Sequence, residues 1–389
     1  MSFPEMPNTR TKFTVLRYLH IVVGVTLYVV DVGTDIWVAA QFGCDGHYTW
    51  FTLTLSLVLS GSLVTQIFSY TWFSDDIKRR ESSCEMTRPQ LILPHILQFG
   101  IFIRYFQLLK KGISAIHSNN QKDHREMFAM ATDMSMLRLF ETFLESAPQL
   151  LLQLYIILGH NHRSAIQYVC IAGSFLSIAW ATVDYRRWFR RSLSHINEMP
   201  SGLPTAVYLF YKLFTITSRI LSLSLLVVLN VYCTLALAVV WLCGTIWAHV
   251  LKTDFCTSRF LEWFYRGVIG VILIFTFFNV KGQGIRVSMI IYYELYVLQN
   301  LAALLSFYFF KSSAETPGYF WPVTFTIVGT NVIGLICLSL FYAFLHPSGQ
   351  RPVVERVADE VDGQEQRYQI AEELGIKSSE MRMEAFLQY

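Results

Sequence analysis

Charged residues are scarce in this chain. Only 15% of its 389 residues are Asp, Glu, Lys or Arg, whereas 53% are hydrophobic. A soluble domain carries about 25% charged residues. The deficit, together with the grouping of the apolar residues into long runs, excludes an ordinary soluble domain and indicates a membrane protein.

Motifs of catalysis and metal binding are also missing. The seven cysteines stand singly, without a CxxC or a His/Cys spacing typical of zinc, so we expect neither a metal site nor a disulfide framework. The sequence has no phosphate-binding P-loop, no HExxH and no GxSxG. We therefore expect no enzyme, no cofactor, no nucleotide-driven pump and no nucleic-acid partner.

Long apolar runs are what the chain does contain. About 20 apolar residues in a helix span the ~30 Å hydrocarbon core of a bilayer. The sequence predicts an all-α polytopic membrane protein with about eight such transmembrane helices. The predicted spans are Thr14–Val38, Thr49–Phe73, Met134–Leu158, Ile166–Asp184, Thr205–Leu229, Val231–Leu251, Val287–Phe310 and Phe320–Leu345.

Two further apolar runs, Leu91–Leu109 and Trp263–Val280, are shorter or more broken by polar residues. Lys and Arg flank both ends of each run, and cytoplasmic loops carry the Lys/Arg excess. A segment that enters and leaves on one side is re-entrant, and we predict two such segments. In the alternative, both runs cross fully, which gives ten spans and places one basic cluster outside the cell: Arg186, Arg187, Arg190 and Arg191.

The order of spans and re-entrant segments repeats, which predicts two pseudo-symmetric halves with both termini cytoplasmic. The N-terminal half is residues 1–198 with re-entrant segment 91–109, and the C-terminal half is residues 199–345 with re-entrant segment 263–280. Residues 346–389 form a polar cytosolic tail that we interpret as regulatory.

Charged residues inside the apolar segments carry the main functional signal. Each costs about 2.5–3.5 kcal/mol at the bilayer centre on insertion scales, so each must face protein, water or another charge. They are either structural pairs, such as Asp31 or Asp35 with Arg138, or the lining of a polar path for headgroups or ions. Besides these three, the set contains Arg104, Glu141, Glu145 and Arg219.

The tail contains the sequence DEVDG at Asp359, Glu360, Val361, Asp362 and Gly363. Executioner caspases prefer this sequence, and an acidic tail is a place where cleavage is physically easy. Cleavage after Asp362 would release a fragment with an apolar end. We hypothesise that this end docks in a cytosolic pocket and inhibits the protein, through Met381, Met383, Phe386, Leu387 and Tyr389.

Five stretches of the chain resemble a known family. The resemblance, which extends over nearly the whole chain, is to the XK-related family of caspase-activated phospholipid scramblases. The stretches are Ser135–Gln149 (SMLRLFETFLESAPQ), Tyr28–Trp37, Ser177–Tyr185, Tyr208–Phe214 and Ile274–Gln283.

This resemblance implies eight spans, two re-entrant segments and ATP-independent exposure of phosphatidylserine at the plasma membrane of apoptotic cells. It also implies an executioner caspase and membrane phospholipids as partners, and some relatives need a single-span accessory glycoprotein. The family's buried charges map onto Asp31, Asp35, Arg104, Arg138, Glu141, Glu145, Asp184 and Arg219. Two other classes stay open, a solute or ion transporter that uses the buried acids and a non-transporting scaffold or receptor.

Overall fold

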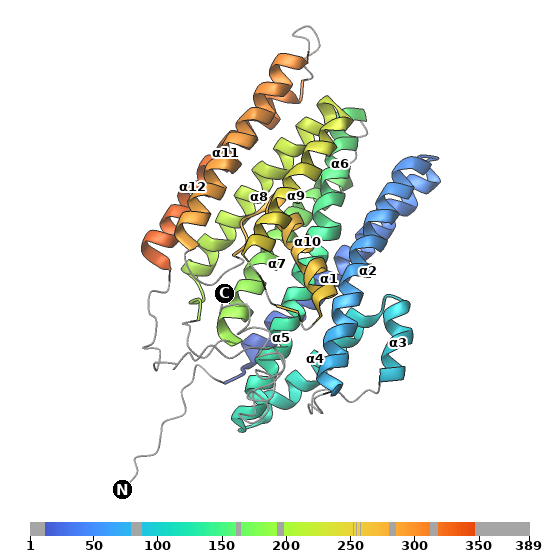
Figure 1. Cartoon of the computed structure of the whole chain (residues 1–389), viewed down its shortest axis with the longest axis vertical. Helices are drawn as coiled ribbons and strands as arrows, with labels where there is room; N and C mark the ends of the chain where they lie inside the picture. The colour runs from blue at the N-terminus through green and yellow to red at the C-terminus, as the bar shows by residue number, and fades with distance from the viewer. Residues whose placement is uncertain are drawn as a thin grey trace.

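The chain folds into a bundle of long helices, as a computed structural model shows (Figure 1). The structure describes residues 12–78, 88–160, 165–192, 198–251, 253, 255–256, 258–279, 285–311 and 318–346. Among these, seven helices are long and apolar enough to cross a membrane, which confirms the predicted all-α polytopic fold. They are Val15–Cys44, Tyr48–Ile77, Gln167–Ser192, Leu203–Leu229, Val231–Val250, Arg286–Phe310 and Phe320–Leu345.

The eighth predicted span, Met134–Leu158, is found inside one continuous helical rod. The rod consists of α5 (Gln121–Glu141), the π-helical turn η2 (Thr142–Ser146) and α6 (Ala147–His160). It is far longer than predicted at its N-terminal end, where thirteen residues from Gln121 to Asp133 extend the helix beyond the apolar run. The remaining helices of this part of the chain are α1 (Val15–Cys44), α2 (Tyr48–Lys78), α3 (Arg88–Ile96), α4 (Gly100–His117) and α7 (Ala165–Ser192).

The first predicted re-entrant segment consists of two helices, α3 and α4, with a break between them. At the break Gln98 adopts φ of 66°, a left-handed backbone conformation that residues other than glycine rarely adopt. Gln66 of α2 stabilises it, since its amide donates to the Gln98 carbonyl at 3.1 Å and its Oε1 accepts from the Gly100 N–H at 3.1 Å. Ser62, one turn earlier on α2, donates to the Gln98 side chain at 2.6 Å.

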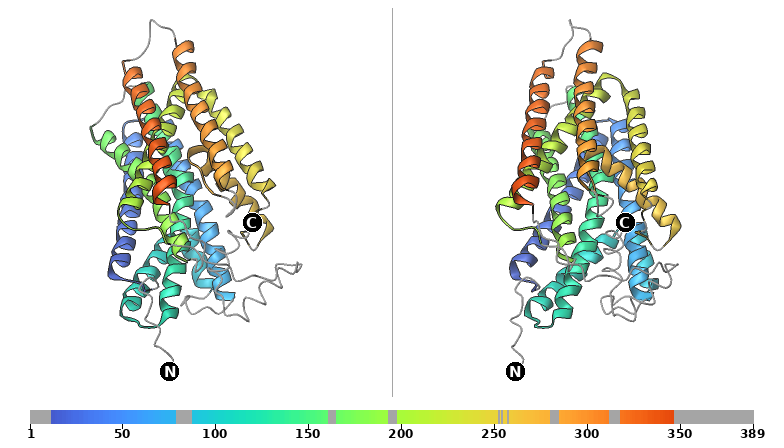
Figure 2. Two further views of the ribbon diagram at one scale, coloured as in Figure 1. Left: turned by 90° about the vertical axis from the view of Figure 1, so that its left-hand side faces the viewer. Right: turned by 60° about the vertical axis from the view of Figure 1, so that its left-hand side comes forward.

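The second predicted re-entrant segment contains one helix, α10 (Arg259–Phe275), and a non-helical stretch from Thr276 to Asn279. The other helices of the C-terminal part are α8 (Leu203–Leu229), α9 (Thr234–Val250), α11 (Ile285–Phe310) and α12 (Phe320–Leu340), which continues as the π-turn η5 (Phe341–Leu345). In the views of Figure 2, α1 begins and α12 ends toward the same end of the bundle. Whether α3–α4 and α10 enter and leave a membrane on one side stays a prediction, as does the division into halves.

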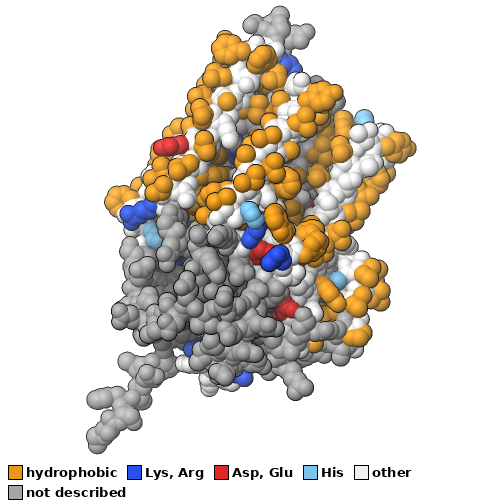
Figure 3. Space-filling view, viewed as in Figure 1, with side chains coloured by type: hydrophobic (Ala, Val, Ile, Leu, Met, Phe, Trp, Pro, Cys, Tyr) orange, Lys and Arg blue, Asp and Glu red, His pale blue; other side chains and the backbone are white. Residues whose placement is uncertain are grey.

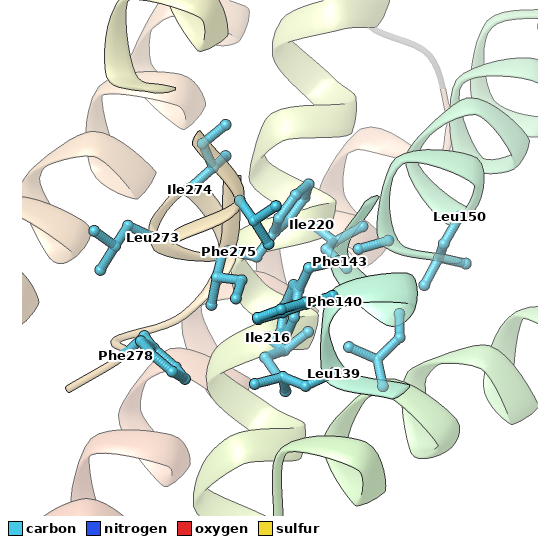
Figure 4. Packing of buried hydrophobic residues seen from close by; sticks show 14 of the residues in the cluster. Leu139, Phe140, Phe143, Leu150, Ile216, Ile220, Leu273, Ile274, Phe275 and Phe278 are labelled. Atoms are coloured by element: carbon cyan, nitrogen blue, oxygen red, sulfur yellow. The ribbon is translucent and has the colours of Figure 1, made fainter. Parts of the chain in front are cut away.

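The largest hydrophobic core joins the rod, α8 and α10. Figure 4 shows how Phe140 and Phe143 of the rod face Ile216 and Ile220 of α8 and the end of α10. Phe143 and Phe275 have ring centroids 6.1 Å apart. The end of α10 is therefore buried inside the protein, where a helix terminus must find hydrogen-bond partners other than water.

Candidate functional site

Arg138 lies at the centre of a buried ion cluster between α1 and the rod. Its guanidinium donates to Asp31 Oδ2 at 2.8 Å and to Glu141 Oε2 at 3.0 Å, and all three side chains are at most 10% exposed. The guanidinium also lies over the Tyr28 ring, with 5.0 Å between Cζ and the ring centroid. One interpretation of the buried charges is that they form structural pairs between helices. The Asp31–Arg138 pair expected under that interpretation is present in the structure.

The π-turn Thr142–Ser146 lies next to this cluster and shapes it. Ser146 donates through Oγ to Asp31 Oδ2 at 3.0 Å, the same oxygen that binds Arg138. Gly61 of α2 packs against the turn so closely that a Cβ built on it would lie 2.8 Å from Glu145 Cβ. A small residue is needed at this crossing, as is common where membrane helices approach closely.

Asp35 and Glu145 are buried beside the cluster and accept no hydrogen bond from a basic side chain of the described residues. Gln149 donates to Asp35 Oδ1 at 2.8 Å. Asp35 Oδ2, Glu145 Oε2 and Gln149 Oε1 have no hydrogen-bond donor among the described residues. Buried acceptors without a partner are costly, so a donor that reached these oxygens would be bound favourably.

Three predicted charges lie outside this cluster, and two of them each bind one neighbouring helix. Asp184 of α7 accepts from His20 of α1, with 2.6 Å between Nε2 and Oδ1. Arg104 of α4 donates to the Ser69 hydroxyl and carbonyl on α2, both at 2.9 Å, and lies 3.8 Å from the Phe73 ring centroid. Both contacts join neighbouring helices.

Arg219 of α8 binds neutral groups at the end of α10 and on α11. Its Nε donates to the Ile274 carbonyl at 2.8 Å, and Nη1 donates to Asn300 Oδ1 at 3.3 Å. Gln299 Oε1 accepts a further bond from Nη2. A cation at the last carbonyls of a helix interacts favourably with the helix dipole, so Arg219 stabilises the buried terminus of α10.

Lys212, two helical turns before Arg219, is a buried charge that sequence analysis missed. Only 1% of it is exposed, and its ammonium donates to Thr276 Oγ1 at 2.9 Å and to the Phe277 carbonyl at 3.0 Å. The Tyr211 ring lies 4.9 Å from its Nζ. The sequence could have indicated it, because Lys212 is a second basic residue, besides Arg219, inside the predicted span Thr205–Leu229.

The predicted sites therefore fall into one ion cluster and separate helix contacts. The structure brings together Asp31, Asp35, Arg138, Glu141 and Glu145, and it leaves Arg104, Asp184 and Arg219 elsewhere. No group of three or more His, Cys, Asp or Glu in the described ranges is placed to hold a metal ion. The DEVDG site at residues 359–363 and the apolar tail end at residues 381–389 lie outside the described residues.

Comparison with known proteins identifies the family. The family model described as XK-related protein matches residues 19–347. The chain is 46% identical over 369 residues to XK-related protein 9 of Tetraodon nigroviridis, covering 91% of this chain and 96% of that protein. It is 31% identical over 355 residues to XK-related protein 8 of Gasterosteus aculeatus, covering 88% and 87%. The resemblance seen in the sequence is confirmed, and the chain belongs to the XK-related family.

Proposed function

We propose that this protein is an ATP-independent phospholipid scramblase that exposes phosphatidylserine during apoptosis. The observation that carries the proposal is the acidic cluster of Asp31, Asp35, Glu141 and Glu145 within the helical bundle. Arg138 is the one guanidinium bound in this cluster, and Asp35 and Glu145 each keep a carboxylate oxygen without a hydrogen-bond donor among the described residues. The ammonium and hydroxyl groups of lipid headgroups are donors of the kind that such oxygens accept.

The mechanism requires only that the barrier to headgroup passage falls. The acyl chains stay in lipid while the headgroup follows polar side chains, and no covalent bond in the lipid changes. Polar groups lower the cost of moving a charged headgroup through hydrocarbon because they replace part of its water. Because the process is passive, it moves lipid down its gradient and needs no nucleotide.

Activation is proposed to be irreversible and proteolytic, at the plasma membrane and from the cytosolic side. An executioner caspase would cut after Asp362 and remove Gly363–Tyr389, which includes the apolar tail end. Loss of an inhibitory segment shifts a two-state equilibrium toward the active form. The support for this part is the DEVDG sequence that follows the last span.

Reconstitution in liposomes tests both parts. The full chain is incorporated with a fluorescent phosphatidylserine, and dithionite bleaches only lipid in the outer leaflet. We expect caspase treatment to make the inner-leaflet lipid bleachable for the wild type and to have no effect on Asp362→Ala. Transport of a small tracer ion by the cleaved protein, without lipid movement, would instead establish the transporter class.

The acidic cluster has its own test in the same assay. After caspase treatment, Glu145→Gln should slow lipid movement about tenfold, because the carboxylate contributes a charge-assisted hydrogen bond to a passing headgroup. Glu294→Gln is the matched control, since Glu294 is an exposed acid on α11, a helix that contributes no residue to the cluster. Equal rates for both variants would indicate that Glu145 has a structural role and does not line a path for lipid headgroups.

A further inference from the structure

The α9–α10 hairpin has a cluster of polar side chains at its loop end, separate from the acidic cluster. The two helices cross closely, because a Cβ on Gly270 would lie 2.8 Å from the Trp241 carbonyl. Arg266 of α10 is held beside the loop: Nε donates to Thr253 Oγ1 at 2.9 Å and Nη2 donates to the Thr253 carbonyl at 2.7 Å. The guanidinium is thus fixed in one orientation before any ligand binds.

His249, on the last turn of α9, completes the group. Its Nδ1 lies 2.6 Å from Arg266 Nη1. Arginine can only donate, so Nδ1 accepts, and the neutral ring carries its proton on Nε2. The ring is exposed and stacks on Trp263, with centroids 4.8 Å apart and planes 22° apart. An exposed Nε2–H therefore lies beside a fixed guanidinium.

Arg266, His249 and Thr253 together have more hydrogen-bond donors than acceptors. Arg266 uses three of its five N–H bonds in the contacts to Thr253 and His249, which leaves two without a partner among the described residues. Glu262 lies 3.6 Å from Arg266 Nε, but its oxygens accept from Thr253 and from the N–H groups of Phe255 and Cys256. Its side chain is 7% exposed, against 12% for that of Arg266, so the carboxylate is the more deeply buried of the two.

Exposed apolar side chains surround these donors. Phe260 is 69% exposed, Trp263 52% and Val250 68%. Figure 3 shows basic, acidic and histidine side chains gathered at this end of the hairpin, with hydrophobic side chains next to them. Aromatic residues beside basic ones are typical of the level of the lipid headgroups. By the predicted topology this end faces the cytoplasmic leaflet, which holds the anionic lipids.

We propose that Arg266 and His249 form a binding site for the phosphate of an anionic phospholipid in the cytoplasmic leaflet. The free guanidinium N–H groups and the Nε2–H of His249 donate to the phosphate oxygens. Trp263 and Phe260 lie along the glycerol and the first acyl carbons. A planar guanidinium suits a phosphate well because it can donate two parallel bonds.

This site does not depend on the proposed scrambling activity, because binding is measured on the uncleaved protein. The full chain is delipidated in detergent and titrated with phosphatidylserine, and bound lipid is counted by native mass spectrometry. We expect His249→Phe, which keeps the stacking on Trp263 but removes the donor, to weaken phosphatidylserine binding about tenfold. Arg266→Gln should weaken it at least as much.

His117→Phe is the matched control, since His117 is another exposed histidine, on α4, and should bind lipid as the wild type does. If Arg266→Gln fails to fold, His249→Phe decides alone. Equal binding by the wild type and His249→Phe would overturn the site. Binding of inorganic phosphate at the same affinity as lipid, or of phosphatidylcholine as strongly as phosphatidylserine, would overturn the assignment to an anionic phospholipid.

Discussion

Two sites in the bundle, the ion cluster around Arg138 and the buried end of α10, bury cations in opposite ways. In the N-terminal part, Arg138 is bound by the carboxylates of Asp31 and Glu141. In the C-terminal part, Arg219 and Lys212 of α8 are bound by carbonyl, amide and hydroxyl oxygens at the end of α10. The first arrangement depends on opposite full charges, and the second depends on dipoles. The cost of removing a cation should therefore differ between them.

The largest expected effect follows from replacing Arg138. Arg138→Met would leave Asp31 and Glu141 buried without their counter-charge, and breaking a buried pair costs about 3–5 kcal/mol. We expect the free energy of unfolding in detergent to fall by about this amount, with little folded protein at 37 °C. Thermal unfolding followed by size-exclusion chromatography measures the change.

Arg138→Lys is the control for that variant. It keeps the positive charge but loses the planar fork that reaches two carboxylates, so its stability should lie between the wild type and Arg138→Met. A stability of Arg138→Met equal to the wild type would show that the acids are protonated or solvated and need no counter-charge.

Replacing Arg219 should have an intermediate effect. Arg219→Met leaves neutral acceptors, the Ile274 carbonyl and two amide oxygens, and an unsatisfied buried polar group costs about 1–3 kcal/mol. Hydrogen exchange should also become faster at the end of α10, because its last carbonyls lose their cation. A loss of stability as large as that of Arg138→Met would contradict the distinction between the two sites.

Replacing Lys212 should have the smallest effect on stability. Lys212→Met removes two hydrogen bonds, but it also removes the cost of burying an ammonium that has no carboxylate partner among the described residues. These terms oppose each other, so we expect the free energy of unfolding to change by no more than about 1 kcal/mol. Faster exchange confined to Thr276–Asn279 would show that Lys212 orders this stretch, and a large destabilisation would contradict the expectation.

The sequence predicted those features that depend on spacing along one helix. Asp31 and Asp35 are four residues apart, so they share a face of α1, and charges in an apolar run must find partners within the protein. Membrane spans followed from hydrophobicity alone, and their ends were less well predicted because polar residues extend several helices beyond the apolar runs.

Contacts between distant helices were beyond the sequence. Nothing near Arg104 indicates that Ser69 binds it, and nothing near Arg219 indicates the end of α10. Lys212 was missed for a different reason. It lies among the aromatic residues of Tyr208–Phe214, and a single basic residue there is easily overlooked in an apolar segment. A charge in any predicted span nevertheless needs a partner within the protein.

The π-turn in the rod has a consequence for any helical wheel drawn through it. Arg138 and Ser146 donate to the same oxygen of Asp31 although they are eight residues apart. At about 100° per residue, eight residues of α-helix leave two side chains about 80° apart, whereas seven leave them only about 20° apart. The surplus residue of the π-turn absorbs this difference. Deleting one residue between Thr142 and Glu145 would thus restore a regular α-helix and still leave Arg138 and Ser146 on one face toward Asp31, whereas converting the turn to α-helix at its present length would turn Ser146 away.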